Sequence, residues 1–252
     1  MDLGLSGKRA IVTGGSKGIG LAIARTLIDE GASVAICARG ATGVEQAVAE
    51  LGERAWGEAV DVSNGDAYTA WLDRAVEHLG GLEIFIGNVA FTPDADDEAR
   101  WKAAFEIDLM HNVRGFTRVL PALVASDAGA AVMISSVSNV MSELPAEEAA
   151  YGAMKAALVS YAAQLAQSSA ADGVRVNVVS PGPVMFEGGV WDQIREAEPD
   201  FYEFALALPA LGRMGTPEEI ARTVAFLASP ASSFTTGANL RVDGGTIKTA
   251  HH

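Results

Sequence analysis

Cysteine and histidine are scarce in this chain. Cys37 is the single cysteine among 252 residues, which excludes an intrachain disulfide and a thiolate metal cluster. The four histidines have no metal-ligand spacing: they are His78, His111, His251 and His252. The terminal pair is consistent with the start of a purification tag. We therefore expect no metal site.

Long apolar runs and basic residues are also lacking. No uninterrupted apolar run approaches the roughly 18 residues of a membrane helix, and the N-terminus lacks the basic-then-apolar pattern of a secretory signal. Asp and Glu number 32 against 18 Lys and Arg, a net charge of −14. Because phosphate contacts need clustered basic side chains, this charge disfavours nucleic acid and anionic membrane surfaces as partners. These absences predict a soluble, cytoplasmic protein.

The stretch from Arg9 to Gly20 combines a strand, a glycine-rich turn and a helix. The apolar run at 10–12 is followed by Gly14, Gly18 and Gly20, and then by helical periodicity without Gly or Pro. A parallel sheet offers a helix N-terminus to a phosphate in this way. Gly14 suits a tight turn, Gly18 lets backbone approach a pyrophosphate, and Gly20 lets helix pack closely on strand. The alternative is a tight turn with no ligand.

Apolar runs and helical patterns alternate along the whole chain. The predicted strands are Ala10–Val12, Ser33–Cys37, Ala55–Val60, Leu82–Ile86, Ala130–Ile134, Arg175–Val179 and Ala238–Val242. The predicted helices are Gly18–Asp29, Val44–Leu51, Asp66–Leu79, a long stretch near Arg100–Ala125, Tyr151–Ala171 and Pro217–Leu227. This alternation predicts a Rossmann-like, doubly wound parallel sheet of about seven strands with helices on both faces. With no repeat or interdomain linker, residues 1–252 are expected to form one dinucleotide-binding and catalytic domain.

The end of the second predicted strand bears on the choice of cofactor. An acidic residue roughly twenty positions beyond the glycines would bind the ribose 2′-hydroxyl of NAD. Ala38 and Arg39 stand there instead, and Lys17 lies inside the glycine turn. Two cations without a carboxylate suit a 2′-phosphate, so we expect NADP rather than NAD. The alternative is that both are ordinary solvated charges.

Polar side chains follow two further strands. Asp61 and Val62 come after the third predicted strand, and Asn88 comes after the fourth. The ligand crevice of an open α/β sheet lies at these carboxyl ends. Asp and Asn at such positions also simply form turns, so this indication is weak by itself.

Tyr151 and Lys155 begin a long Ala-rich helix after the fifth predicted strand. Their i and i+4 spacing puts both side chains on one face. A nearby ammonium favours the phenolate and lowers a tyrosine pKa from about 10, which suits Tyr151 to proton transfer. A serine at the neighbouring strand end could hold a substrate oxygen. The alternative is a plain pair on a helix surface.

Taken in order, these motifs resemble those of the short-chain dehydrogenase/reductase family, and the resemblance covers essentially the whole chain. The Thr-Gly-x-x-x-Gly-x-Gly motif corresponds to residues 13–20, and Tyr-x-x-x-Lys to residues 151–155. Further matches are Asp61, Asn88, Pro181-Gly182, Gly212-Arg213-x-Gly215-x-Pro217-Glu218-Glu219 and Val242-Asp243-Gly244-Gly245. The pattern is similar to the 3-oxoacyl-carrier-protein reductase branch.

The resemblance implies hydride transfer between a nicotinamide and a carbonyl or secondary alcohol carbon. Tyr151 is then the acid or base, Lys155 lowers its pKa and holds the nicotinamide ribose, and the serine polarises the carbonyl. The cofactor contacts implied are Gly14, Ser16, Lys17, Gly18, Ile19, Gly20, Arg39, Asp61, Val62, Asn88, Tyr151, Lys155, Pro181, Gly182 and Val184. Family members are usually tetramers, so a homotetramer is expected, with the C-terminal strand and the Tyr-bearing helix at subunit contacts.

The sequence departs from the family pattern in three places. Asp108, seven residues beyond Trp101, stands where the family has a proton-relay Asn. Residues 87–90 read Gly-Asn-Val-Ala rather than Asn-Asn-Ala-Gly, and Phe186 replaces a Thr that contacts the carboxamide. An ionised Asp108 near Lys155 would offset the pull of the lysine on the phenolate. Alternatively, Asp108 is merely a polar helix residue.

The catalytic serine has two candidates. A spacing of 13 residues before Tyr151 selects Ser138, whereas alignment to the strand end selects Ser136. Because loops tolerate insertions and strand geometry fixes a side chain better, we favour Ser136.

The segment at about 186–211 is the expected substrate lid. It mixes aromatic and aliphatic residues with several acids, which predicts an amphipathic flap over an apolar pocket. The alternative is a plain surface helix. Acids near the mouth disfavour a highly anionic carrier-linked substrate and favour a neutral, fairly apolar ketone or alcohol. A rival hypothesis is a non-catalytic NADP(H)-binding regulatory protein on the same scaffold. Tyr151 and Lys155 favour the enzyme, whereas the changes at Asp108 and Phe186 support the rival.

Overall fold

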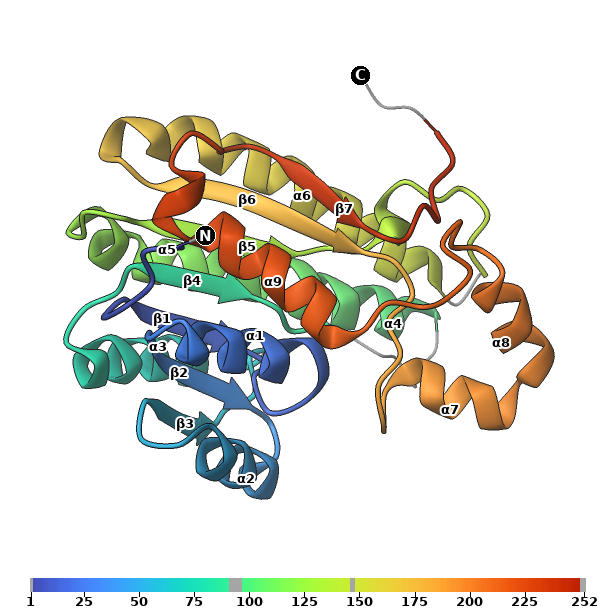
Figure 1. Ribbon diagram of the computed structural model, residues 1–252, viewed down its shortest axis with the longest axis horizontal. Helices are drawn as coiled ribbons and strands as arrows, with labels where there is room; N and C mark the ends of the chain where they lie inside the picture. Colours follow the sequence, from blue (N-terminus) through green and yellow to red (C-terminus); the bar gives the residue numbers. More distant parts are fainter. Residues whose placement is uncertain (1, 91–96, 146–147, 250–252) are drawn as a thin grey trace.

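The computed structural model describes residues 2–90, 97–145 and 148–249, so His251 and His252 lie outside the described residues. Seven parallel strands form one sheet in the order β3-β2-β1-β4-β5-β6-β7 (Figure 1). They are β1 (Arg9–Thr13), β2 (Ser33–Ala38), β3 (Ala55–Ala59), β4 (Ile84–Gly87), β5 (Ala130–Ile134), β6 (Arg175–Pro181) and β7 (Asn239–Val242). The predicted doubly wound parallel sheet is confirmed.

Helices cover both faces of this sheet (Figure 1). One face packs against α1 (Gly18–Asp29), α2 (Ala41–Leu51) and α9 (Pro217–Ala228). The other packs against α3 (Gly65–Leu79), α5 (His111–Val124) and α6 (Ala149–Ser169). Successive strand residues point to opposite faces, so Ala10 and Val12 enter the first apolar cluster and Ile11 the second. No helix among the described residues is long and apolar enough to cross a membrane.

The predicted helical stretch near 100–125 is interrupted in the structure. It comprises α4 (Asp97–Ala104), a π-helical segment, η1 (Phe105–Met110), and then α5. A π turn adds a residue to the helical ladder and re-aims the side chains within it, and such turns are frequent at functional sites. The 186–211 segment likewise holds two short helices, α7 (Val190–Ala197) and α8 (Pro199–Leu206). The 3₁₀ turns are η2 (Val137–Asn139), η4 (Ala170–Asp172) and η5 (Pro230–Ser232).

The direction of winding reverses beside β1. The chain passes from β1 through β2 to β3 at one edge, and then returns to β4, which pairs with the other side of β1. The crevice of such a sheet lies outside the carboxyl ends of the strands at this switch point. Gly14 follows β1 and Asn88 follows β4, so both predicted cofactor motifs are brought to the switch point.

Candidate functional site

The glycine turn between β1 and α1 has the geometry expected from its spacing. Gly14 and Gly18 have φ angles of +68° and +55°, in the left-handed region that glycine adopts at low cost. A Cβ on Gly20 would lie 2.2 Å from the main-chain oxygen of Gly14, so only glycine permits this helix–turn contact. Helix α1 begins at Gly18 without a side-chain cap from Lys17. Its first N–H groups therefore face the switch point, where an anion would be stabilised.

Asn88 joins this turn to β4. Its Nδ2 donates to the main-chain oxygens of Thr13 at 2.9 Å and Gly14 at 3.3 Å. The Thr13 hydroxyl in turn accepts from the Asn88 N–H at 2.9 Å. The amide of Asn88 thus fixes the first residues of the turn, so this predicted cofactor contact also has a structural task.

Phe186 lies over the same turn. A Cβ built on Gly18 would be 2.5 Å from Cζ of the Phe186 ring, and one on Gly189 would be 2.9 Å from it. The ring also packs against the apolar cluster that contains α1 and α9. Gly14 and Gly20 thus let neighbouring protein atoms approach the turn closely, whereas at Gly18 an aromatic side chain takes the space beside the backbone.

The other predicted cofactor contacts are distributed around the same sheet edge. Ser16, Lys17 and Ile19 belong to the glycine turn or the first turn of α1, and Arg39 follows β2 with its side chain exposed, as is that of Lys17. Asp61 is exposed, and its Oδ1 accepts hydrogen bonds from the Ser63 N–H and hydroxyl at 2.9 and 2.8 Å. This local turn is what an Asp after a strand forms without any ligand.

Residues beyond β6 serve packing as well. Pro181 ends β6, and a Cβ on Gly182 would lie 2.8 Å from Cα of Asp243. The Val184 side chain is buried in the apolar cluster of α1 and α9, as the Val62 side chain is buried in that of α3 and α5. Only the backbone of these two valines is left for a ligand.

Tyr151 and Lys155 lie on one face of α6. The Lys155 Nζ is 5.4 Å from the centroid of the Tyr151 ring. Lys155 is 1% exposed, and its Nζ donates to the main-chain oxygen of Ile134 at 3.0 Å. Lys155 is therefore buried at the end of β5 and Tyr151 is partly buried, so the predicted Tyr–Lys pair is not simply displayed on a helix surface.

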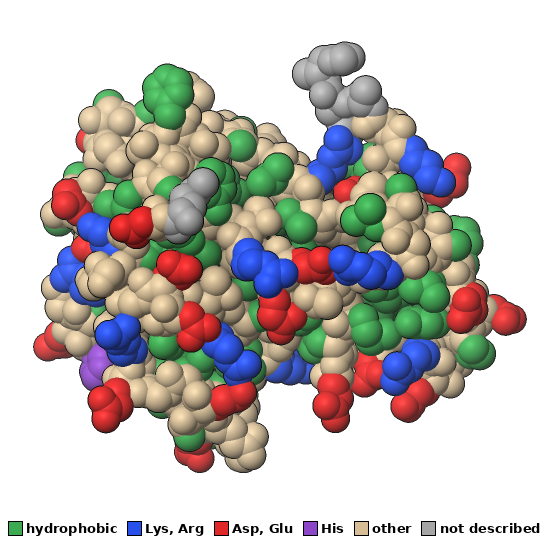
Figure 2. All heavy atoms as spheres, in the orientation of Figure 1, with side chains coloured by type: hydrophobic (Ala, Val, Ile, Leu, Met, Phe, Trp, Pro, Cys, Tyr) green, Lys and Arg blue, Asp and Glu red, His purple; other side chains and the backbone are tan. Residues whose placement is uncertain are grey.

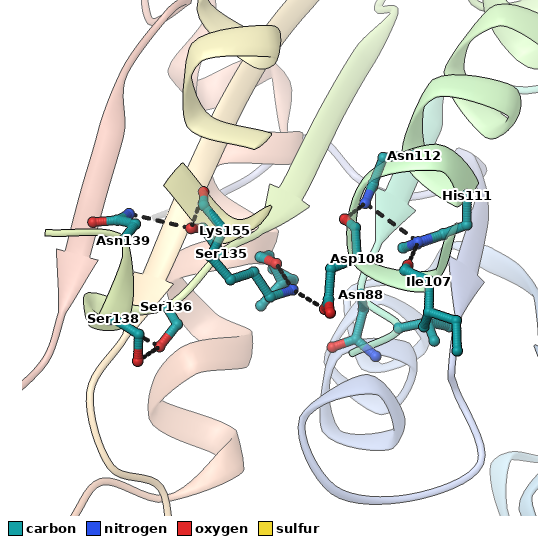
Figure 3. Close-up of polar contacts among 12 residues, drawn as sticks. Asn88, Ile107, Asp108, His111, Asn112, Ser135, Ser136, Ser138, Asn139 and Lys155 are labelled. Atoms are coloured by element: carbon teal, nitrogen blue, oxygen red, sulfur yellow. Dashed lines mark hydrogen bonds and ion pairs between the residues drawn. The ribbon is translucent and has the colours of Figure 1, made fainter. Parts of the chain in front are cut away.

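Asp108 meets this lysine from the π-helical turn. Its Oδ1 lies 3.1 Å from Lys155 Nζ, and the Asp108 side chain has no exposed surface (Figure 3). The interpretation of Asp108 as a merely polar helix residue does not describe this geometry. The two side chains form a buried ion pair.

The Tyr151 pKa is set by opposing effects. Burial raises it above its ordinary value near 10, the Lys155 ammonium lowers it, and the Asp108 carboxylate raises it again. Burial also lowers the pKa of Lys155, but Asp108 and Tyr151 outweigh this, and the net shift is upward. From the sequence we expected Lys155 to lower the tyrosine pKa and Asp108 to offset this in part, without the effect of burial. In the structure, the pKa of Tyr151 is raised overall, because the effect of burial is larger than that of Lys155.

Ser136 is the serine that contacts the tyrosine. A hydrogen bond between the Ser136 hydroxyl and the Tyr151 phenol lowers the pKa of the phenol. Ser136 Oγ also donates to Ser138 Oγ at 3.1 Å and accepts from the Ser138 N–H at 3.1 Å (Figure 3). Ser138 thus contacts Ser136, whereas Ser136 contacts the tyrosine.

Two polar residues that the sequence reasoning missed hold the helix in place. Ser135 Oγ donates to the main-chain oxygen of Lys155 at 3.0 Å, and Asn139 Nδ2 donates to Ser135 Oγ at 3.1 Å (Figure 3). Strand alternation was the available signal, because it directs Ser135 and Ser136 to opposite faces. Ser135 therefore anchors α6, whereas Ser136 faces the tyrosine.

The 186–211 segment carries an aromatic row beside exposed apolar side chains. The ring centroids of Trp191 and Phe201 are 5.9 Å apart, and those of Phe201 and Phe204 are 6.3 Å apart. Phe204 is 61% exposed and Leu211 is 71% exposed. Figure 2 shows apolar side chains gathered around α7 and α8, with acidic side chains around them. The segment is amphipathic, as predicted.

The chain is similar to known dehydrogenases and reductases over nearly its whole length. Residues 14–246 match the family model described as enoyl-(acyl carrier protein) reductase. The cis-4-hydroxycyclohexanecarboxylate dehydrogenase of Sinomonas cyclohexanicum is 36% identical over 245 residues, covering 94% of this chain and 95% of that protein. The 3-oxoacyl-[acyl-carrier-protein] reductase of Vibrio cholerae is 34% identical over 247 residues, covering 96% and 98%. The crystal structure of a dehydrogenase/reductase from Sinorhizobium meliloti has a TM-score of 0.88 at 32% identity, covering 97% of both chains.

The Rossmann-like sheet and these relatives define a class, the nicotinamide-dependent oxidoreductases. Within that class, the chain belongs to the short-chain dehydrogenase/reductase family and is similar to its 3-oxoacyl-carrier-protein reductase branch. The family implies a nicotinamide cofactor, either NAD or NADP.

Proposed function

We propose that the protein interconverts a carbonyl and a secondary alcohol with NADP(H), using Tyr151 as acid and base. The observation that carries this proposal is the juxtaposition of three groups. The Lys155 ammonium lies 5.4 Å from the Tyr151 ring centroid, and the Ser136 hydroxyl bonds to the phenol. A phenol with a cation and a hydroxyl beside it is suited to proton transfer at a substrate oxygen.

The nicotinamide, when bound, supplies or accepts the hydride at the substrate carbon. In reduction, Tyr151 donates its phenolic proton to the substrate oxygen, and in oxidation its phenolate takes the proton of the alcohol. Ser136 donates a hydrogen bond to the same oxygen and so stabilises the charge that develops there. Lys155 stabilises the phenolate, and Asp108 keeps Lys155 charged while opposing its effect on the phenol.

The residues that would hold the dinucleotide follow from their places at the sheet edge. The glycine turn and the N-terminus of α1 suit the pyrophosphate. Arg39 and Lys17 suit a 2′-phosphate, because Ala38 and Arg39 stand where an acidic NAD-binding side chain is expected after β2. By resemblance, Asp61 lies near the adenine and Lys155 near the nicotinamide ribose. Val62, Asn88 and residues 181–184 are the remaining proposed cofactor contacts.

The 186–211 segment is proposed as the substrate lid, over a neutral and fairly apolar substrate. Its support is the exposed apolar surface of Phe204 and Leu211 together with the six acids of the segment, which repel anions: Glu187, Asp192, Glu196, Glu198, Asp200 and Glu203. The name of the Sinomonas relative denotes a ring alcohol that carries a carboxylate. Cyclohexanone and 4-oxocyclohexanecarboxylate are therefore a matched pair of substrates that differ in charge.

A homotetramer is proposed from the exposed surface around β7. This strand is the last in the sheet order, Leu240 is 42% exposed, and Phe234 is fully exposed. An unpaired edge strand with apolar side chains is typical of a surface that another subunit covers. Light scattering coupled to gel filtration measures the mass directly.

The function is tested by following NADPH absorbance with a panel of ketones, and NADP⁺ reduction with the corresponding alcohols. Turnover of a neutral ketone above that of its carboxylate analogue supports both the activity and the substrate class. Tight NADPH binding with no turnover across the panel would instead favour the non-catalytic regulatory protein.

A further inference from the structure

Asn112 connects the π-helical turn to α5. It lies in the first turn of α5 with no exposed surface, and its Nδ2 donates to the main-chain oxygen of Asp108 at 3.0 Å (Figure 3). The neighbouring His111 contacts the main-chain oxygen of Ile107 through Nδ1. Two successive carbonyls of the π turn are therefore bound by side chains one turn further along the chain.

The other end of the Asn112 amide lies against β4. A Cβ on Gly87, the last residue of β4, would lie only 1.9 Å from Asn112 Oδ1. No side chain fits there while the asparagine keeps its place. Gly87 is one of the positions that depart from the family pattern, and the amide of Asn112 gives that departure a physical reason.

Stability alone does not favour an asparagine at this position. Asparagine is a weaker helix former than leucine or alanine, and Asn112 Oδ1 is buried without a hydrogen-bond partner in the described part of the chain. Leaving such an acceptor unpaired is destabilising. What the residue contributes is the bond from Nδ2 to the backbone of Asp108.

We infer that Asn112 is a positioning residue for the site: its amide holds the Asp108 backbone so that the carboxylate pairs with Lys155, and Gly87 leaves the space that the amide needs. This inference rests on the proposed function of Tyr151 and Lys155. The Asp108 carboxylate reaches Lys155 from a widened turn, where one residue more or less in the ladder would rotate it away. The Asn112 bond closes that turn.

Other titratable and charged groups lie near the Asp108–Lys155 pair, and they bear on how a shift in the Tyr151 titration is interpreted. Tyr151 itself lies on α6, and Glu148, the residue just before this helix, raises the Tyr151 pKa. On α5 these groups are His111 and Arg114, and Arg114 pairs with Glu106 of the π turn. Burial lowers the pKa of His111 to about 3, so this ring stays neutral over the working range. A shift of the tyrosine titration therefore reports on Asp108, Lys155 and Glu148.

The experiment measures the Tyr151 titration in three variants, Asn112→Ala, Asn112→Ser and Asp108→Asn. Ultraviolet difference spectra of each protein against its own Tyr151→Phe derivative isolate this one tyrosine and require neither cofactor nor substrate. Asn112→Ala should move the titration to lower pH, in the direction of Asp108→Asn and by at least half as much. The double variant Asn112→Ala/Asp108→Asn should match Asp108→Asn alone. Asn112→Ser should titrate like the wild type, because a helical serine can donate to the carbonyl four residues back.

Asn177→Ala is the matched control. Asn177 is also fully buried, and its Nδ2 also donates to a main-chain oxygen, that of Thr235 at 2.9 Å. This control should lower the melting temperature without moving the tyrosine titration. An Asn112→Ala protein that melts earlier but titrates like the wild type would overturn the inference and leave Asn112 a packing residue. Because the readout is independent of turnover, an inactive wild type would count against the proposed function only.

The close fit between Gly87 and the Asn112 amide can be tested by a second measurement. Gly87→Ala should strongly lower the melting temperature of the wild type and have little effect in the Asn112→Ala background, where the conflicting oxygen is absent. Equal losses in both backgrounds would mean that the two positions are not matched.

Discussion

The carboxylate of Asp108 lies 3.1 Å from the ammonium of Lys155, and both side chains are buried. The lysine beside the proposed proton donor is thus paired with an anion. Because Asp108 raises the pKa of Tyr151 while Lys155 lowers it, the phenol is influenced by both partners of the ion pair. The pH dependence of the enzyme should follow from this balance.

Replacing Asp108 by asparagine should shift the oxidative pH–rate profile to lower pH, by about one pH unit. The sign follows from the charge: Asp108 raises the Tyr151 pKa, so its removal lowers that pKa. Alcohol oxidation needs the phenolate and should gain activity nearer neutrality. Profiles of kcat for the wild type and Asp108→Asn measure this, and identical profiles would show that Asp108 is not coupled to the tyrosine.

Tyr151→Phe should bind NADPH as the wild type does and lose most of its turnover. The substitution removes the acid and leaves the helix intact, and general acid catalysis is typically worth about 10²–10⁴-fold in rate. Fluorescence titration with NADPH is the control for binding. A variant that keeps more than about a tenth of the wild-type kcat contradicts the assigned role.

Ser136→Ala should lower kcat much more than Ser138→Ala. Ser136 bonds to the phenol, whereas Ser138 contacts Ser136 and lies behind it. The pair is internally matched, because the two serines differ only in position along the same turn. The reverse order of effects would transfer the role to Ser138.

Arg39→Asp should abolish or invert a preference for NADPH over NADH. Each charge-assisted contact to a 2′-phosphate contributes roughly 1.5–3 kcal/mol, and the new carboxylate would repel the phosphate and bind a ribose hydroxyl. The measurement is kcat/KM for both cofactors, with Arg25→Asp on the exposed surface of α1 as the control. Equal kcat/KM values for the two cofactors in the wild type would exclude the predicted NADP preference.

Phe186→Ala should tighten the binding of the dinucleotide several-fold. The Phe186 ring packs on Gly18, so a pyrophosphate that approaches this glycine must displace it. Phe204→Ala removes an exposed ring from the same 186–211 segment and should leave the NADPH Kd unchanged. Weaker NADPH binding by Phe186→Ala would show that the ring contacts the cofactor directly.

Much of the fold is determined by patterns that are local in the chain. Ala10, Ile11 and Val12 alternate between the two apolar clusters as a buried parallel strand requires. Gly20 was expected to let the helix pack closely on the strand, and in the structure its close approach is to the main-chain oxygen of Gly14 in the turn. Such features depend on neighbouring residues and on backbone geometry, so the sequence alone was enough to predict them.

The electrostatics of the site depend on residues that are distant in the chain. The sequence placed Asp108 near Lys155 but gave no sign of the π turn. Asn112 binds the backbone of that turn, and the Asn112 amide needs the space left by Gly87. Likewise, Lys155 alone predicted a lowered pKa for Tyr151, and burial reverses that sign. Local sequence fixes which groups are available, whereas their burial and mutual distances, which determine the sign of a pKa shift, exist only once the strands and helices have packed together.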